Sequence, residues 1–89
     1  MDKKQKHEKA EKFRQEIVMP AQRAAAINDL LVKTSYDESD ELRLTILLQK
    51  TDYLFGCEAD YARLINKVSS VGSEKIKSKA LEFYRRWHA

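Results

Sequence analysis

The stretch EIVMPAQ, residues 16–22, decides the fold, because Pro20 interrupts what the apolar pattern predicts to be an unbroken helix. Apolar residues recur at intervals of three and four, which is the period of one side of a helix running from about residue 8 to residue 33. They are Ala10, Phe13, Ile17, Pro20, Ala24, Ile27 and Leu31. A proline inside a helix removes one backbone hydrogen bond and clashes with the preceding turn, which costs about 3 kcal/mol.

Pro20 has two possible interpretations. As the first residue of a separate helix it would be well placed, because that position needs no amide hydrogen. Met19 would then be the cap, and methionine has no side-chain oxygen to accept the free amides of the first turn. Because the apolar period passes through the proline unbroken, we predict one helix that is kinked at Pro20.

A cluster of capping residues, TSYDES at positions 34–39, predicts the start of a second helix. Ser35 and Glu38 have the spacing of a capping box, and the acidic residues that follow suit a helix N-terminus. The apolar period then continues to Val68, with Gly56 as a gentle bend. Its members are Leu44, Leu47, Thr51, Leu54, Glu58, Tyr61, Ile65 and Val68. We therefore predict one long second helix.

The sequence SSVGS, residues 69–73, predicts an end to the second helix and a new start, with Ser73 as the cap of a third. Ile76, Ala80, Phe83 and Trp87 give the third helix its own apolar stripe, so we assign the aromatic residues Phe83 and Trp87 to the core.

Helix lengths predict the architecture. At 1.5 Å per residue the first two helices would be about 39 and 40 Å long and the third only about 21 Å. The fold class is therefore all-α: a long antiparallel hairpin with a shorter third helix, forming a three-helix bundle that we expect to dimerise. Residues 1–89 make a single helical domain, in which we expect residues 1–7 to be frayed or disordered.

Composition limits the class of protein. In 89 residues, 35% are charged and 43% hydrophobic, a balance typical of a folded soluble protein rather than a disordered one. The chain has one cysteine, Cys57, which favours a reducing compartment. No apolar run approaches the roughly 20 residues needed to cross a bilayer. We therefore expect a cytoplasmic protein without a membrane partner.

The third helix is too short to cover the whole hairpin, and the half left uncovered is rich in leucine. Exposed apolar patches of that kind mark interaction sites, so we predict a protein interface with a second copy, as a homodimer, or with another protein. The expected interface residues are Leu30, Leu31, Leu42, Leu44, Ile46 and Leu48, together with the acidic turn of Asp37, Glu38, Asp40 and Glu41. The alternative is that the third helix is angled so that it covers the hairpin by itself.

Charge is uneven along the chain, because the first and last thirds are basic and the middle third is acidic. In an antiparallel hairpin the basic segments would share one end and the acidic turn would lie at the other. The basic pole could bind the phosphates of a nucleic acid. Its expected contact residues are Lys9, Lys12, Lys75, Lys79, Arg85 and Arg86, with Tyr84 available to stack on a base.

No pattern of catalytic, cofactor-binding or metal-ligating residues stands out. His7 and His88 lie near opposite ends of the chain, Cys57 has no basic neighbour to activate it, and no glycine-rich loop could hold phosphates. We therefore predict a non-enzymatic protein without cofactor or metal. Its expected function is that of a regulator or inhibitor that occupies the surface of a larger partner, with nucleic-acid binding as the alternative.

Overall fold

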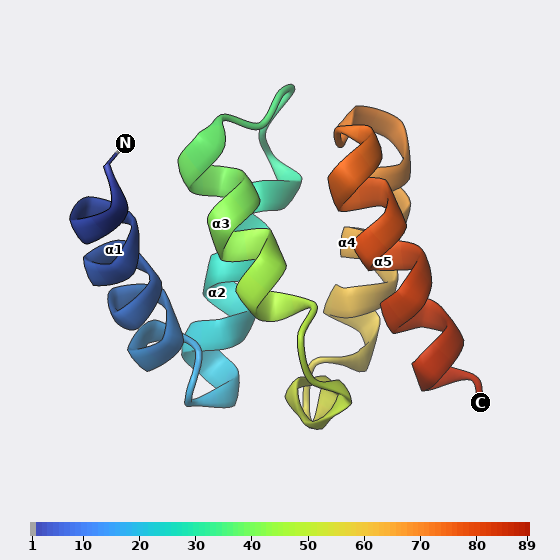
Figure 1. Cartoon of the computed structure of the whole chain (residues 1–89). Coiled ribbons are helices and arrows are strands. Elements are labelled where there is room, and N and C mark those ends of the chain that lie inside the picture. The colour runs from blue at the N-terminus through green and yellow to red at the C-terminus, as the bar shows by residue number, and fades with distance from the viewer. Residues whose placement is uncertain (1) are drawn as a thin grey trace.

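The computed structural model describes residues 2–89 and is all-helical over that range (Figure 1). The all-α class is confirmed, although two of the three expected helices are divided. The described residues form five α-helices and one 3₁₀ helix. These are α1 (Lys3–Glu16), α2 (Pro20–Leu31), α3 (Glu38–Leu47), η1 (Thr51–Leu54), α4 (Glu58–Val71) and α5 (Glu74–Trp87). Residues 3–7, expected to be frayed, belong to α1, and Met1 lies outside the described residues.

The helices lie in two layers and successive helices run in opposite directions (Figure 1). α1 packs on α3, and α3 packs on α5, while α2 and α4 pack on each other behind them. Contacts of α1 with α2 and of α4 with α5 join the layers. The first residues of α1, α3 and α5 consequently share one end of the molecule, and the loops 17–19 and 48–57 share the other.

The prediction of one kinked helix through Pro20 is wrong. α1 ends at Glu16, and Pro20 is the first residue of α2, with Met19 as an N-cap that makes no side-chain hydrogen bond. Proline is harmless at this position because the first amide of a helix has no intrahelical acceptor. The apolar period continues through residues 17–19 because Ile17 and Ile27 are both buried in the core, although the chain reverses direction between them.

The long second helix is also divided. α3 ends at Leu47, and the chain passes through η1 before α4 begins at Glu58. Gly56 has a φ of 72°, a left-handed conformation that glycine adopts without a steric penalty and that no helix can contain. Within the expected apolar seam, Glu58 is exposed. Gly56 therefore marks a reversal of the chain and is not a gentle bend.

Of the two helix caps predicted from the sequence, one is confirmed and the other is formed by different residues. Ser73 accepts a hydrogen bond from the amide of Ile76, so α5 begins directly after the cap that the sequence predicted. The capping box of α3 is formed by Asp37 and Asp40, not by Ser35 and Glu38. An aspartate oxygen accepts the same amide hydrogen bond that serine would, so the type of start was right and its register was wrong by two residues.

Tyr61 links α4 to the end of α3. Its side chain is fully buried and stacks on Phe83, with the ring centroids 5.0 Å apart. Its hydroxyl donates to the carbonyl oxygen of Leu47 at 2.6 Å, and burial raises the pKa of Tyr61, which keeps the hydroxyl protonated and able to donate. This bond satisfies one of the carbonyl groups left free where α3 ends.

We expect Tyr61→Phe to destabilise the protein by about 1–2 kcal/mol, because it leaves the Leu47 carbonyl buried without a donor. Urea unfolding followed by circular dichroism measures the change. Tyr84→Phe is the matched control, because the Tyr84 side chain is 45% exposed, and it should leave the unfolding midpoint unchanged. Equal midpoints for Tyr61→Phe and the wild type would contradict the role of this bond.

Candidate functional site

A buried arginine joins the two loops at one end of the molecule. Arg23, on the first turns of α2, is only 3% exposed. One terminal nitrogen donates to the carbonyl oxygens of Ile17 at 2.8 Å and Val18 at 3.3 Å, and the other donates to that of Phe55 at 3.1 Å. The guanidinium also lies 5.2 Å from the ring centroid of Tyr53. We call this set of contacts the arginine clamp.

The clamp holds loop 17–19 against loop 55–57. The thiol of Cys57 lies 3.4 Å from the carbonyl oxygen of Pro20, in a second contact that joins loop 55–57 to the first residue of α2. A Cβ placed on Gly56 would lie 3.5 Å from the Cβ of Pro20, so the backbones themselves are close. The two loops therefore form one surface, although they are more than 30 positions apart in the sequence.

Large apolar side chains project from this surface into solvent. Val18 is 65% exposed, Met19 is 58% exposed and Phe55 is 75% exposed. We call these residues the loop-end patch. Exposed apolar side chains that gather at one place on a small protein often mark a binding site. The sequence does not predict this patch, because its apolar period places Val18 and Met19 inside one helix and Phe55 inside another.

The leucine-rich end expected to be an uncovered interface is part of the core. Leu30, Leu44, Ile46 and Leu48 are each no more than 3% exposed. Leu31 and Leu42 are partly buried and pack against that core. The expectation of an uncovered apolar end is wrong because the break at residues 48–57 folds α4 back over α2, and α5 then covers α3.

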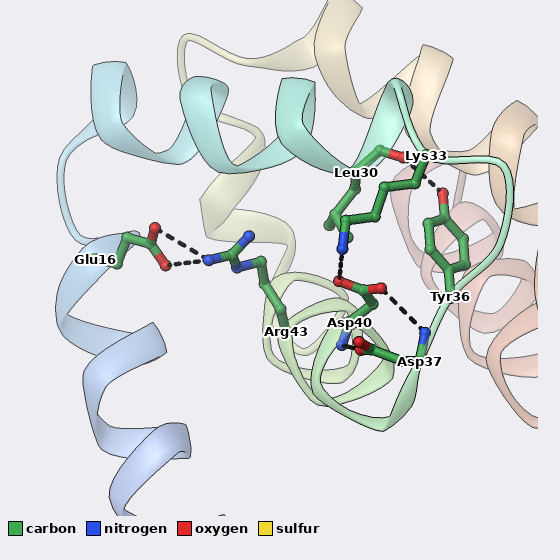
Figure 2. A network of polar contacts seen from close by, with 7 residues as sticks. All are labelled: Glu16, Leu30, Lys33, Tyr36, Asp37, Asp40 and Arg43. Carbon is green, nitrogen blue, oxygen red and sulfur yellow. Dashed lines mark hydrogen bonds and ion pairs between the residues drawn. The ribbon is translucent and has the colours of Figure 1, made fainter.

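The acidic turn is largely engaged in holding the fold together (Figure 2). The two oxygens of the Asp40 carboxylate accept hydrogen bonds from the Lys33 ammonium at 2.7 Å and from the Asp37 amide at 3.0 Å. Asp37 in turn accepts from the Asp40 amide at 2.8 Å, and Tyr36 donates to the Leu30 carbonyl at 3.1 Å. Two of the acidic residues that the sequence predicted to form an interface, Asp37 and Asp40, therefore cap the start of α3.

These contacts change the acidity of two groups. The hydrogen bond from the Asp40 backbone amide holds the pKa of Asp37 below its usual value. The hydrogen bond to the Asp40 carboxylate raises the pKa of Lys33, which keeps the ammonium charged. α3, which begins at this turn, is joined to α1 through Arg43, whose guanidinium lies 3.3 Å from the Glu16 carboxylate (Figure 2).

Basic and acidic residues do not occupy opposite poles. Lys9 and Lys12 line a groove between α1 and α3 that also contains Lys33, Asp37 and Asp40. Lys75 and Lys79 line a separate cleft of about 130 Å³, bounded by α1, α3 and α5. The other residues around that cleft are Lys6, Glu38, Glu41, Leu42, Thr45 and Ile76. The expected poles are wrong because the divided helices bring the starts of α1, α3 and α5 to one end.

The C-terminal residues of the expected nucleic-acid surface divide between two roles. Arg86 donates to the Leu48 carbonyl at 2.9 Å and lies over the ring of Phe83, so it helps to fix α5 to the end of α3. Arg85 and Tyr84 are exposed to solvent. The structure does not bring Lys9, Lys12, Lys75, Lys79 and Arg85 onto one uninterrupted basic surface.

No protein-family model, curated protein or solved structure matches this chain. Within residues 2–89, no helix combines the length and the apolar character needed to span a bilayer. Over the described part of the chain, no group of three or more histidine, cysteine, aspartate and glutamate side chains is arranged to hold a metal ion.

We expect Arg23→Met to destabilise the protein by about 2–3 kcal/mol, because the carbonyl oxygens of Ile17, Val18 and Phe55 lose their donor while the side-chain volume is nearly kept. Chemical denaturation measures this change. Arg63→Met is the control, since Arg63 forms an exposed pair with Asp60 and should contribute less than about 0.5 kcal/mol. Equal losses in the two variants would contradict the clamp.

We expect the stability gained from Asp37 to be lost in acid. Its pKa is lower in the folded state than the ordinary value of 3.8, so the contribution is complete above pH 3.8 and disappears as the pH falls through the folded-state pKa. Asp37→Asn keeps a capping oxygen but cannot titrate. Urea midpoints measured from pH 7 to pH 2 should therefore fall less steeply in Asp37→Asn than in the wild type. Parallel profiles would contradict the role of Asp37, and Asp29→Asn, on the exposed side of α2, serves as the control.

Proposed function

We propose that this chain is a non-enzymatic protein-binding module that acts as a regulator or inhibitor by placing the loop-end patch on the surface of a larger protein. The observation that carries the proposal is the exposure of Val18, Met19 and Phe55 on two loops that the buried Arg23 holds together. Binding interfaces are centred on a few large apolar and aromatic side chains that lose their water on contact.

The rigidity of the patch supports the proposal. A flexible loop must be ordered when it binds, and that ordering reduces the affinity. Here the guanidinium fixes the carbonyl groups of Val18 and Phe55, and Met19 directly precedes α2. Methionine and phenylalanine add complementary properties, because the methionine side chain adapts to its partner and the phenylalanine ring is stiff.

The leucine-rich interface that the sequence predicted no longer supports this function, because its side chains are largely in the core. Nucleic-acid binding has less support than protein binding. In both grooves that hold the expected lysines, carboxylates line the same surface, and these would repel a phosphate backbone.

The proposal can be tested by photo-crosslinking in the cells that naturally make the protein. A photoreactive amino acid replacing Phe55 should form a covalent adduct with one defined larger protein. The Val18→Asp substitution in the same chain should lower the adduct yield about tenfold, because it places a charge in the centre of the apolar contact.

Val32→Asp is the matched control. Val32 is the same residue type and is even more exposed, at 81%, but it lies at the opposite end of α2. The adduct yield should be unchanged by this substitution. A lack of adduct at position 55, or an equal loss of yield in Val18→Asp and Val32→Asp, would overturn the proposal.

A further inference from the structure

A second apolar surface lies on the outer side of α5. Ile76, Ala80 and Phe83 point into the core, whereas Leu81 is 49% exposed and Tyr84 is 45% exposed. His88, one turn after Tyr84, is exposed, and the centroids of the two rings lie 4.3 Å apart. Arg85 is exposed beside them. We call Leu81, Tyr84, Arg85 and His88 the outer row.

The outer row and the loop-end patch have complementary charges. Asp52 and Glu58 lie on either side of Phe55 along the chain, are exposed, and form no ion pair within residues 2–89. Lys50 is the one basic residue on the same loop. The outer row presents the opposite balance, because Arg85 and Arg86 are exposed in the last turns of α5 and outnumber one exposed acid, Glu82. Each surface thus combines apolar side chains with a charge that suits the other.

We propose that the loop-end patch of one molecule receives the outer row of a second copy. This inference rests on the patch used in the proposed function, and it identifies a second copy as one occupant of that patch. Contact between two loop-end patches is disfavoured, because the acidic residues beside Phe55 would face their own copies. Contact between two outer rows would bring together two surfaces that each carry an excess of basic residues. Pairing of unlike surfaces satisfies both charge sets.

The contact area that a dimer needs, and the position of the two surfaces on the molecule, favour a dimer held by two reciprocal contacts. A stable dimer buries about 800 Å² on each partner, and one contact between the patch and the row is smaller than that. Two reciprocal contacts would bury twice the area of one, which requires both surfaces to lie near one end of the molecule. They do, because Arg86 fixes the last turn of α5 to the Leu48 carbonyl, and the C-terminus lies at the end that carries the loops (Figure 1). The second copy would then compete with the larger partner for the same patch.

The test uses two variants that each remove one surface. Phe55→Asp removes the patch and leaves the row, whereas Tyr84→Asp removes the row and leaves the patch. In sedimentation equilibrium the wild type should dimerise, and each variant alone should associate about a hundredfold more weakly, because neither can form the unlike contact. Circular dichroism checks that both variants remain helical. Val18→Asp provides a second patch variant, and Val32→Asp should dimerise like the wild type.

Mixing the two variants gives the deciding result. An equimolar mixture of Phe55→Asp and Tyr84→Asp retains one intact patch and one intact row, so one contact should reappear. The chain has two methionines, so methyl labelling of methionine in Tyr84→Asp should show a Met19 signal that shifts when unlabelled Phe55→Asp is added. A mixture without this shift, dimerisation of Phe55→Asp alone, or a monomeric wild type would overturn the inference. These outcomes leave the crosslink to a larger partner unaffected, so the two proposals fail separately.

Discussion

The arrangement of the chain depends on a buried cation that has backbone carbonyls as its partners. Arg23 is 3% exposed, and none of the ion pairs in residues 2–89 includes it. Burying a charge is costly unless hydrogen bonds replace its hydration. The carbonyl oxygens of Ile17, Val18 and Phe55 supply this replacement for the two terminal nitrogens of Arg23, whereas its Nε makes no hydrogen bond within residues 2–89. The carbonyl groups of Ile17 and Val18 follow the end of α1, where no backbone amide of that helix is available to them. Arg23 donates to both, so the contact gives partners to the arginine and to these carbonyl groups.

This contact determines how the remaining segments meet. By joining loop 17–19 to loop 55–57, it fixes the points at which the chain reverses before α2 and before α4. These two helices then pack against each other, and α4 brings α5 over α3. The leucine-rich segments become the centre of the molecule, and the apolar residues left outside are those on the clamped loops.

The sequence predicted the elements whose signals are local. The apolar stripe of α5 and its Ser73 cap depend on residues within one or two turns, and both were correct. The breaks at residues 17–19 and 48–57 were missed because the apolar period continues through them. The lack of a cap at Met19 argued against a helix start there, but Arg23 stabilises the turn by a contact with Phe55, 32 positions away. Such a contact leaves no periodic signal, so the loop-end patch that depends on it could not be predicted either.

Under the proposed function, the clamp also separates stability from recognition at the same residues. Arg23 binds carbonyl oxygens, which every amino acid has, so the contact does not depend on which side chains occupy positions 18 and 55. The side chains of Val18 and Phe55 are largely exposed and contribute little to the core. Substitutions there can change what the surface binds while the frame is preserved. At Ile17 the arrangement is different, because its side chain is fully buried, so this position is constrained by packing as well as by the clamp.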